Sequence, residues 1–86
     1  MNIHVSNLSL NLIDLDIRRL FAAFGEVSLA VIVRDRNNGR SRGHAFVEMP
    51  NHRQAEQAIV SLDGTVLDGK KMTVAEVKYT PGEHFN

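Results

Sequence analysis

Aromatic and cationic side chains alternate with small apolar ones within residues 42–49. Successive side chains of an extended segment point to opposite faces. One face would then carry Arg42, His44, Phe46 and Glu48, and the other Ala45, Val47 and Met49. An outward ring can stack on an unpaired base, and an arginine can contact a phosphate or stack as a guanidinium plane. With the first set outward, these groups have the chemistry to contact nucleic acid. The structural alternative is that Phe46 is a core residue.

Positive charge is concentrated just before and at the start of this stretch. Four arginines flank an Asn-Gly turn signal, and Asp35 reduces their charge to a net +3 within residues 34–42. They are Arg34, Arg36, Arg40 and Arg42. Such side chains bind phosphate oxygens whatever the base sequence. The segment predicts a phosphate-binding loop, and a merely solvated loop is the alternative.

The composition narrows the possible functions. The 86 residues suffice for one small domain, and ten Lys+Arg balance ten Asp+Glu. A neutral chain must bind a polyanion through local clustering. The absence of cysteine excludes disulfides and thiolate metal sites. We expect a cytoplasmic protein without a membrane segment, because no signal-peptide pattern and no apolar run near the roughly 20 residues of a membrane span is found. We expect no enzyme, because no acid, base and nucleophile would be brought together.

Hydrophobic periodicity predicts the elements that would position these residues. Apolar side chains alternate in the extended segments and recur every three to four residues in the helical ones. Asn11 and Asn51 are the expected helix N-caps, and Gly25 and Asp63-Gly64 the expected helix ends. The predicted order is strand 3–6, helix 12–24, strand 27–33, strand 44–49, helix 52–62, a short extended piece at 66–67 and strand 72–77. This βαββαβ order predicts an α+β, ferredoxin-like fold, with two helices on one face of a four-stranded antiparallel sheet.

Two short motifs resemble the signatures of one family. Residues 42–49, Arg-Gly-His-Ala-Phe-Val-Glu-Met, match five of the seven specified positions of K/R-G-F/Y-G/A-F-V-x-F/Y and depart at His44 and Met49. Residues 3–8, Ile-His-Val-Ser-Asn-Leu, resemble the companion signature and depart only at His4. By these motifs the chain is identified as a member of the RNA recognition motif family. It resembles the small stand-alone bacterial members, with the motif at 1–79 and a short tail at 80–86.

The resemblance implies binding of single-stranded RNA on the open face of the sheet. In the family the first and third strands are central neighbours, and the segment after the last strand often extends the binding face. The implied RNA-binding residues are His4, Ser6, Arg34, Arg36, Arg40, Arg42, His44, Phe46, Lys78 and Tyr79. Neither a cofactor nor a metal is expected, because two histidines without a third ligand make a poor metal site.

A protein-interaction module on the same fold is the alternative function. Histidines stand where the family usually has aromatic rings, and Leu12 and Leu15 exceed what the core face of the first helix needs. Such an apolar patch contacts a protein partner or packs under the neighbouring loop. We expect the protein to be a monomer. We also expect Val31 to lie on the open face, because of a bulge near Ala30. Since histidine titrates near pH 6.5, the two histidines are expected to strengthen RNA binding on acidification.

Overall fold

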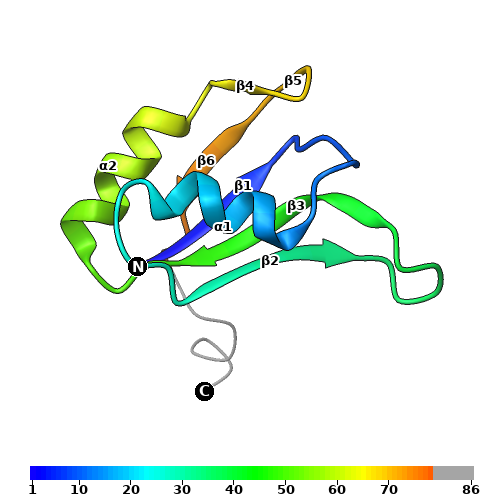
Figure 1. Ribbon diagram of the computed structural model, residues 1–86, viewed down its shortest axis with the longest axis horizontal. Coiled ribbons are helices and arrows are strands. Elements are labelled where there is room, and N and C mark those ends of the chain that lie inside the picture. Colours follow the sequence, from blue (N-terminus) through cyan, green and yellow to red (C-terminus); the bar gives the residue numbers. More distant parts are fainter. Residues whose placement is uncertain (79–86) are drawn as a thin grey trace.

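Four strands form one antiparallel sheet in the computed structural model, which describes residues 1–78 (Figure 1). The sheet order is β2-β3-β1-β6, so β1 and β3 are the predicted central neighbours. The strands are β1 (Asn2–Ser6), β2 (Leu29–Arg34), β3 (Ser41–Glu48) and β6 (Thr73–Glu76), and the helices are α1 (Asp14–Ala22) and α2 (His52–Leu62). A separate short hairpin consists of β4 (Val66–Leu67) and β5 (Lys70–Lys71). The predicted ferredoxin-like fold is confirmed. Tyr79 and the tail at 80–86 lie outside the described residues.

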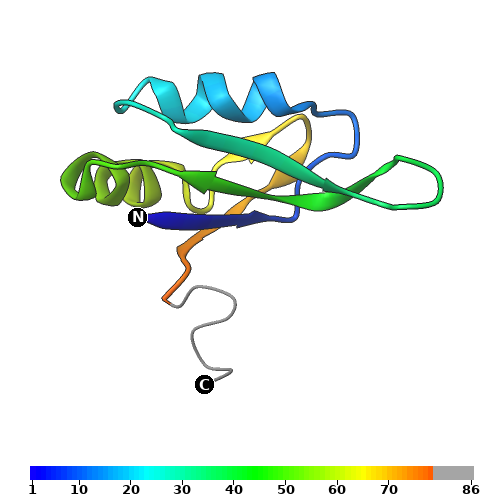
Figure 2. The same cartoon turned by 90° about the horizontal axis from the view of Figure 1, so that it is seen from below.

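Alternation along the strands divides the sheet into a core face and an open face. Both helices bury side chains in the core that the inward residues of the sheet also form. The buried members include Ile3 and Val5 of β1, Ala45 and Val47 of β3, Ile17 and Phe21 of α1, and Ala55 and Ala58 of α2. Figure 2 shows α1 lying along this side of the strands, and neither helix covers the opposite side. Neither helix within residues 1–78 has the length and apolar content to cross a membrane.

The start of α1 differs from the prediction, whereas the start of α2 agrees with it. The N-cap of α1 is Ile13, whose N–H donates to Asp16 Oδ2 at 2.9 Å. Asn11 instead donates from its side chain to Asp68 Oδ2 at 3.4 Å, so the predicted cap is used to join two loops. An acid three residues into the helix takes over the capping function. In α2 the predicted Asn51 cap is confirmed, since its Oδ1 accepts the N–H of Gln54 at 2.9 Å.

The pairing of β2 with β3 contains an irregularity at a place that the sequence did not indicate. Ile32 pairs with Ala45 and Arg34 with Ser41, so β3 carries two extra residues in this interval. Gly43 lies within it and has φ +80°, in the left-handed region that favours glycine. The predicted bulge near Ala30 is wrong, because that part of β2 pairs regularly. Val31 nevertheless lies on the open face, as expected.

An aspartate binds one backbone N–H at each edge of the sheet. Ile32 N–H of β2 donates to Asp14 Oδ1 at 2.8 Å, and Val74 N–H of β6 donates to Asp63 Oδ1 at 2.9 Å. Asp14 opens α1, and Asp63 is the C-cap of α2. Unpaired edge groups invite pairing with another chain. The helix termini therefore bind one free backbone N–H at each sheet edge and cover part of that edge.

We predict that Asp14→Ala lowers the free energy of unfolding by about 1–2 kcal/mol, because the N–H of Ile32 loses its acceptor. Asp14→Asn keeps an acceptor oxygen and should lose less. Urea denaturation of the three proteins provides the measurement. An Asp14→Ala midpoint equal to that of the unsubstituted protein would contradict the role given to this hydrogen bond.

Candidate nucleic-acid interface

Three rings meet at the centre of the open face. His4 of β1 is paired in register with Phe46 of β3, and their ring centroids are 5.0 Å apart at an interplanar angle of 39°. His44 completes the group, with its centroid 5.2 Å from that of His4 and 6.3 Å from that of Phe46. Phe46 is 40% exposed, as the strand alternation predicts. The structure therefore brings the three predicted ring residues into one cluster, which we call the ring platform.

Apolar side chains extend the ring platform across the whole sheet. The pairing aligns Val31 of β2, Phe46, His4 and Ala75 of β6 in one row that runs across all four strands. Val31 is 38% exposed, and Leu29, two residues earlier on the same face of β2, is 46% exposed. Flat rings surrounded by apolar groups form a surface on which the faces of unpaired bases can stack. Leu29 and Ala75 were not among the residues predicted to form this surface.

The two histidines of the ring platform are hydrogen-bonded to each other. Nε2 of His4 and Nδ1 of His44 are 3.1 Å apart, so one of the two nitrogens carries an N–H that donates a hydrogen bond and the other accepts it. Partial burial, and secondly the charge of His44, lower the pKa of His4 below 6.5. Two protonated rings could not keep this hydrogen bond, because both nitrogens would then be donors.

This lowered pKa has a consequence for stability. The unfolded chain takes up a proton at His4 near pH 6.5, whereas the folded chain does so only at lower pH. The contribution of His4 to the free energy of unfolding is therefore complete above pH 6.5. It falls as the pH decreases from there through the lowered pKa of His4.

The loop between β2 and β3 is organised around Asp35. Its Oδ1 accepts the N–H of Asn37 at 2.8 Å and that of Asn38 at 3.2 Å, and these bonds hold the pKa of this carboxyl below its usual value. The backbone closes through Gly39 N–H to Asp35 O at 2.9 Å and Asp35 N–H to Arg40 O at 2.8 Å. The predicted Asn-Gly turn is confirmed. The only acid of the loop is thus engaged by the backbone of the turn.

The arginines of this loop differ in how they are held. Arg34 donates from Nη1 to the carbonyl of Gly39 at 3.2 Å, and so folds back onto the loop. Arg36 and Arg40 are exposed, and within residues 1–78 their guanidinium groups make no hydrogen bond or ion pair. The loop extends beyond the end of the sheet (Figure 1). Both guanidinium groups are accessible to a phosphate.

A depression of about 370 Å³ adjoins the ring platform. Four of the predicted site residues border it, together with five residues that were not predicted as part of the site. The predicted ones are His4, Ser6, Arg42 and His44, and the others are Asn7, Leu8, Leu10, Gly43 and Lys70. No local sequence signal marks Leu10, in the segment after β1, or Lys70, in the β4–β5 hairpin. Both reach this place because the segment after β1 bonds to β3 through Leu8 N–H and Gly43 O, and to the hairpin through Asn7 and Lys71 O.

Two other predicted features lie elsewhere. Lys78 places Nζ 3.5 Å from Glu76 Oε1 and borders a different depression, next to Val60 of α2. Leu12 is partly buried and packs against the core, which agrees with the packing alternative for this residue and not with a free apolar surface. Leu15 is 45% exposed.

Comparisons with known proteins agree with this architecture. The family model for the RNA recognition motif matches residues 3–73. The chain is 42% identical over 78 residues to the protein RbpD of Nostoc sp. strain PCC 7120, covering 91% of this chain and 83% of RbpD. It superimposes on the crystal structure of RNA Binding Protein PG1 with a TM-score of 0.90 and 38% identity, covering 94% and 98% of the two chains. It also matches the Sxl-lethal protein in complex with RNA, with a TM-score of 0.88 and 28% identity, covering 94% of this chain and 48% of that one. The chain therefore belongs to the RNA recognition motif family.

Proposed function

We propose that this chain binds single-stranded RNA across the open face of its sheet. Bases stack on the ring platform, and phosphates are held by Arg36, Arg40 and Arg42. The main observation is the row of open-face side chains in which Phe46 and His4 lie 5.0 Å apart on the two central strands. Family membership and the similarity to a protein solved in complex with RNA support the same conclusion.

The geometry favours single strands over duplexes. Base faces are covered by their neighbours in a duplex, and only splayed nucleotides can present them to a protein ring. The platform offers stacking surface and few groups that could read a base edge, so sequence preference is expected to be weak. The family assignment makes the chain a binding domain rather than an enzyme. We expect it to act in the cytoplasm as a monomer, with the motif ending near residue 79.

A protein-interaction module is the less supported function. Leu10, Ile13 and Leu15 expose apolar surface around the start of α1, and a protein partner at this place remains a prediction. The ring platform and the arginine loop, however, combine stacking surface with free positive charge, which is the combination that RNA requires.

We predict that Phe46→Ala weakens binding of an oligouridylate by about 1–3 kcal/mol, because the exposed ring supplies stacking area. Phe46→Tyr retains the ring and should bind like the unsubstituted protein. Fluorescence anisotropy gives the affinities, and urea denaturation confirms that the fold is intact. Equal affinity of the alanine variant would show that bases do not stack at this position.

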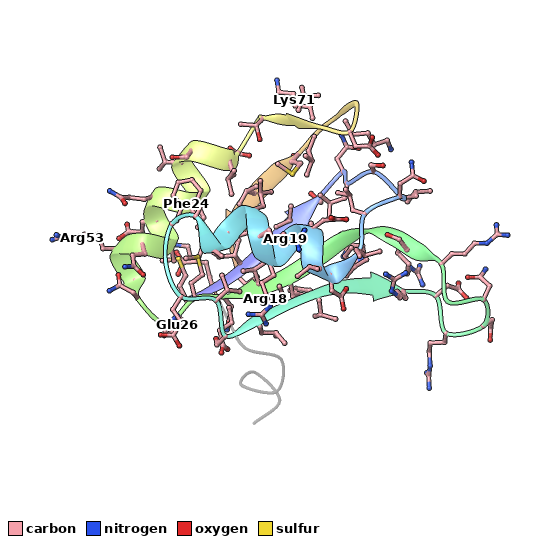
Figure 3. All side chains as sticks on the ribbon, in the orientation of Figure 1. Arg18, Arg19, Phe24, Glu26, Arg53 and Lys71 are labelled. Carbon is pink, nitrogen blue, oxygen red and sulfur yellow. The ribbon has the colours of Figure 1, made fainter. Side chains whose placement is uncertain are left out.

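The double substitution of Arg36 and Arg40 by Ala should weaken binding of every RNA sequence alike. Each lost phosphate contact should make the dependence of log K on log salt shallower by about 0.7. Arg19 and Arg53 lie on α1 and α2 (Figure 3). Their replacement by Ala removes the same charge from the helix layer and provides the control. If the two double variants have the same salt dependence, the loop is not part of the site.

Binding should strengthen on acidification. A bound polyanion favours the protonated ring and raises the pKa of His4, so the complex takes up a proton that the free protein does not hold. RNA affinity should therefore increase as the pH falls from the pKa of His4 in the complex to its pKa in the free protein. The measurement covers about pH 8 to about pH 5.5. The variant with both His4 and His44 replaced by Phe should show no such dependence. Constant affinity of the unsubstituted protein over this range would mean that the histidines do not contact RNA.

A further inference from the structure

The β4–β5 hairpin is fastened to the segment that follows β1. Asn7 donates from Nδ2 to the carbonyl of Lys71 at 2.7 Å, and Ser9 Oγ and Asn11 Nδ2 both donate to Asp68 Oδ2. Asn7 and Asp68 have φ values of +57° and +51°, a conformation that asparagine and aspartate tolerate better than most residues. In Figure 1 the segment after β1 lies between this hairpin and the start of β3. The hairpin is therefore held beside the ring platform by side-chain contacts.

This attachment places Lys70 at the depression of about 370 Å³ that adjoins the ring platform. Arg42 and Gly43 border it from β3. Leu10 is 64% exposed and borders the same space. A Cβ on Gly43 would lie 3.5 Å from Leu10 Cδ2, so the leucine side chain passes close to the glycine backbone. The depression thus combines an apolar side chain with two cationic ones.

The charged side chains that border the depression are positive. Arg42 and Lys70 both border it, and none of the lining residues within 1–78 is acidic. Asp68, in the hairpin, directs its carboxylate to Ser9 and Asn11 instead. The volume of the depression lies within the range of small-ligand sites. Its cationic side chains match the anionic phosphate of one nucleotide, and Leu10 matches the flat apolar base.

We propose that this depression is an additional nucleotide subsite next to the ring platform, in which Lys70 contacts the phosphate and Leu10 packs against the base. It rests on the proposed function and deepens it. His4 and His44 belong to both the ring platform and the depression. An RNA strand that crosses the platform therefore continues into the subsite, and RNAs long enough to reach it gain one more phosphate contact.

The neighbouring lysine provides a matched control. Lys71 has its Cε 3.7 Å from the position of a Cβ built on Gly64, at the end of α2, and does not border the depression. Figure 3 shows it on the outer edge of the hairpin. Lys70→Ala and Lys71→Ala remove the same charge from adjacent exposed positions, so only a local contact can distinguish them.

The test compares a uridine dinucleotide with a uridine octanucleotide over a series of salt concentrations. Lys70→Ala should weaken octanucleotide binding about two- to fivefold, as expected for one exposed ion pair. It should make the slope of log K against log salt shallower by about 0.7. Dinucleotide binding should change little, and Lys71→Ala should behave like the unsubstituted protein. Leu10→Ala should weaken octanucleotide binding without changing the slope, while the exposed Val60→Ala on α2 should have no effect.

Two outcomes would contradict the inference in different ways. If Lys70→Ala and Lys71→Ala have equal affinities and slopes while Phe46→Ala still weakens binding, the subsite does not exist but the proposed function stands. If the unsubstituted protein binds neither RNA, the proposed function fails, and the subsite with it. Circular dichroism of each variant establishes that the fold is retained.

Discussion

The antiparallel pairing of β1 with β3 is the constraint on which both the core and the binding face depend. One register places Ile3 opposite Val47 and Val5 opposite Ala45, and all four side chains are 1% exposed or less. The same register places His4 opposite Phe46 on the other face. A slip by one residue would expose the core side chains and bury the rings. The free energy of core packing therefore also holds the ring platform in place.

The five aspartates of this neutral chain all have structural roles. Each of the five aspartates accepts a hydrogen bond from a backbone N–H or a side-chain donor. Asp14 and Asp63 cap the sheet edges, Asp16 caps α1, Asp35 closes the β2–β3 turn, and Asp68 fastens the hairpin. These carboxylates are held in structural positions at helix ends and turns. Arg36 and Arg40, in contrast, extend freely into solvent, so the distribution of charge matters here more than its sum.

Local rules in the sequence predicted much of the fold and the ring platform. Strand alternation placed Phe46 and Ala45 on opposite faces, the family signature assigned Phe46 to the open one, and both assignments are confirmed. The Asn51 cap and the Asn-Gly turn also depend only on neighbouring residues, and the structure contains both.

The helix cap at Asn11 and the lining of the depression were missed because they depend on segments far apart in the chain. Asn11 was expected to cap a helix, but Asp68 lies close enough in space to bind its side chain. The contribution of Lys70 to the depression arises in the same way, because hydrogen bonds from the segment after β1 determine where the hairpin lies. No periodicity or motif within either segment predicts such a contact.

Contact between the ring platform and bases is the central claim, and intermolecular nuclear Overhauser effects test it most directly. Protein labelled with ¹³C is mixed with an unlabelled oligouridylate, and cross-peaks from RNA protons to ring protons of His4, His44 and Phe46 are recorded. Our account predicts contacts from the uracil H5 and H6 protons to Phe46 and His4. Contacts found only at side chains of α1 or α2, with none at the three rings, would contradict it.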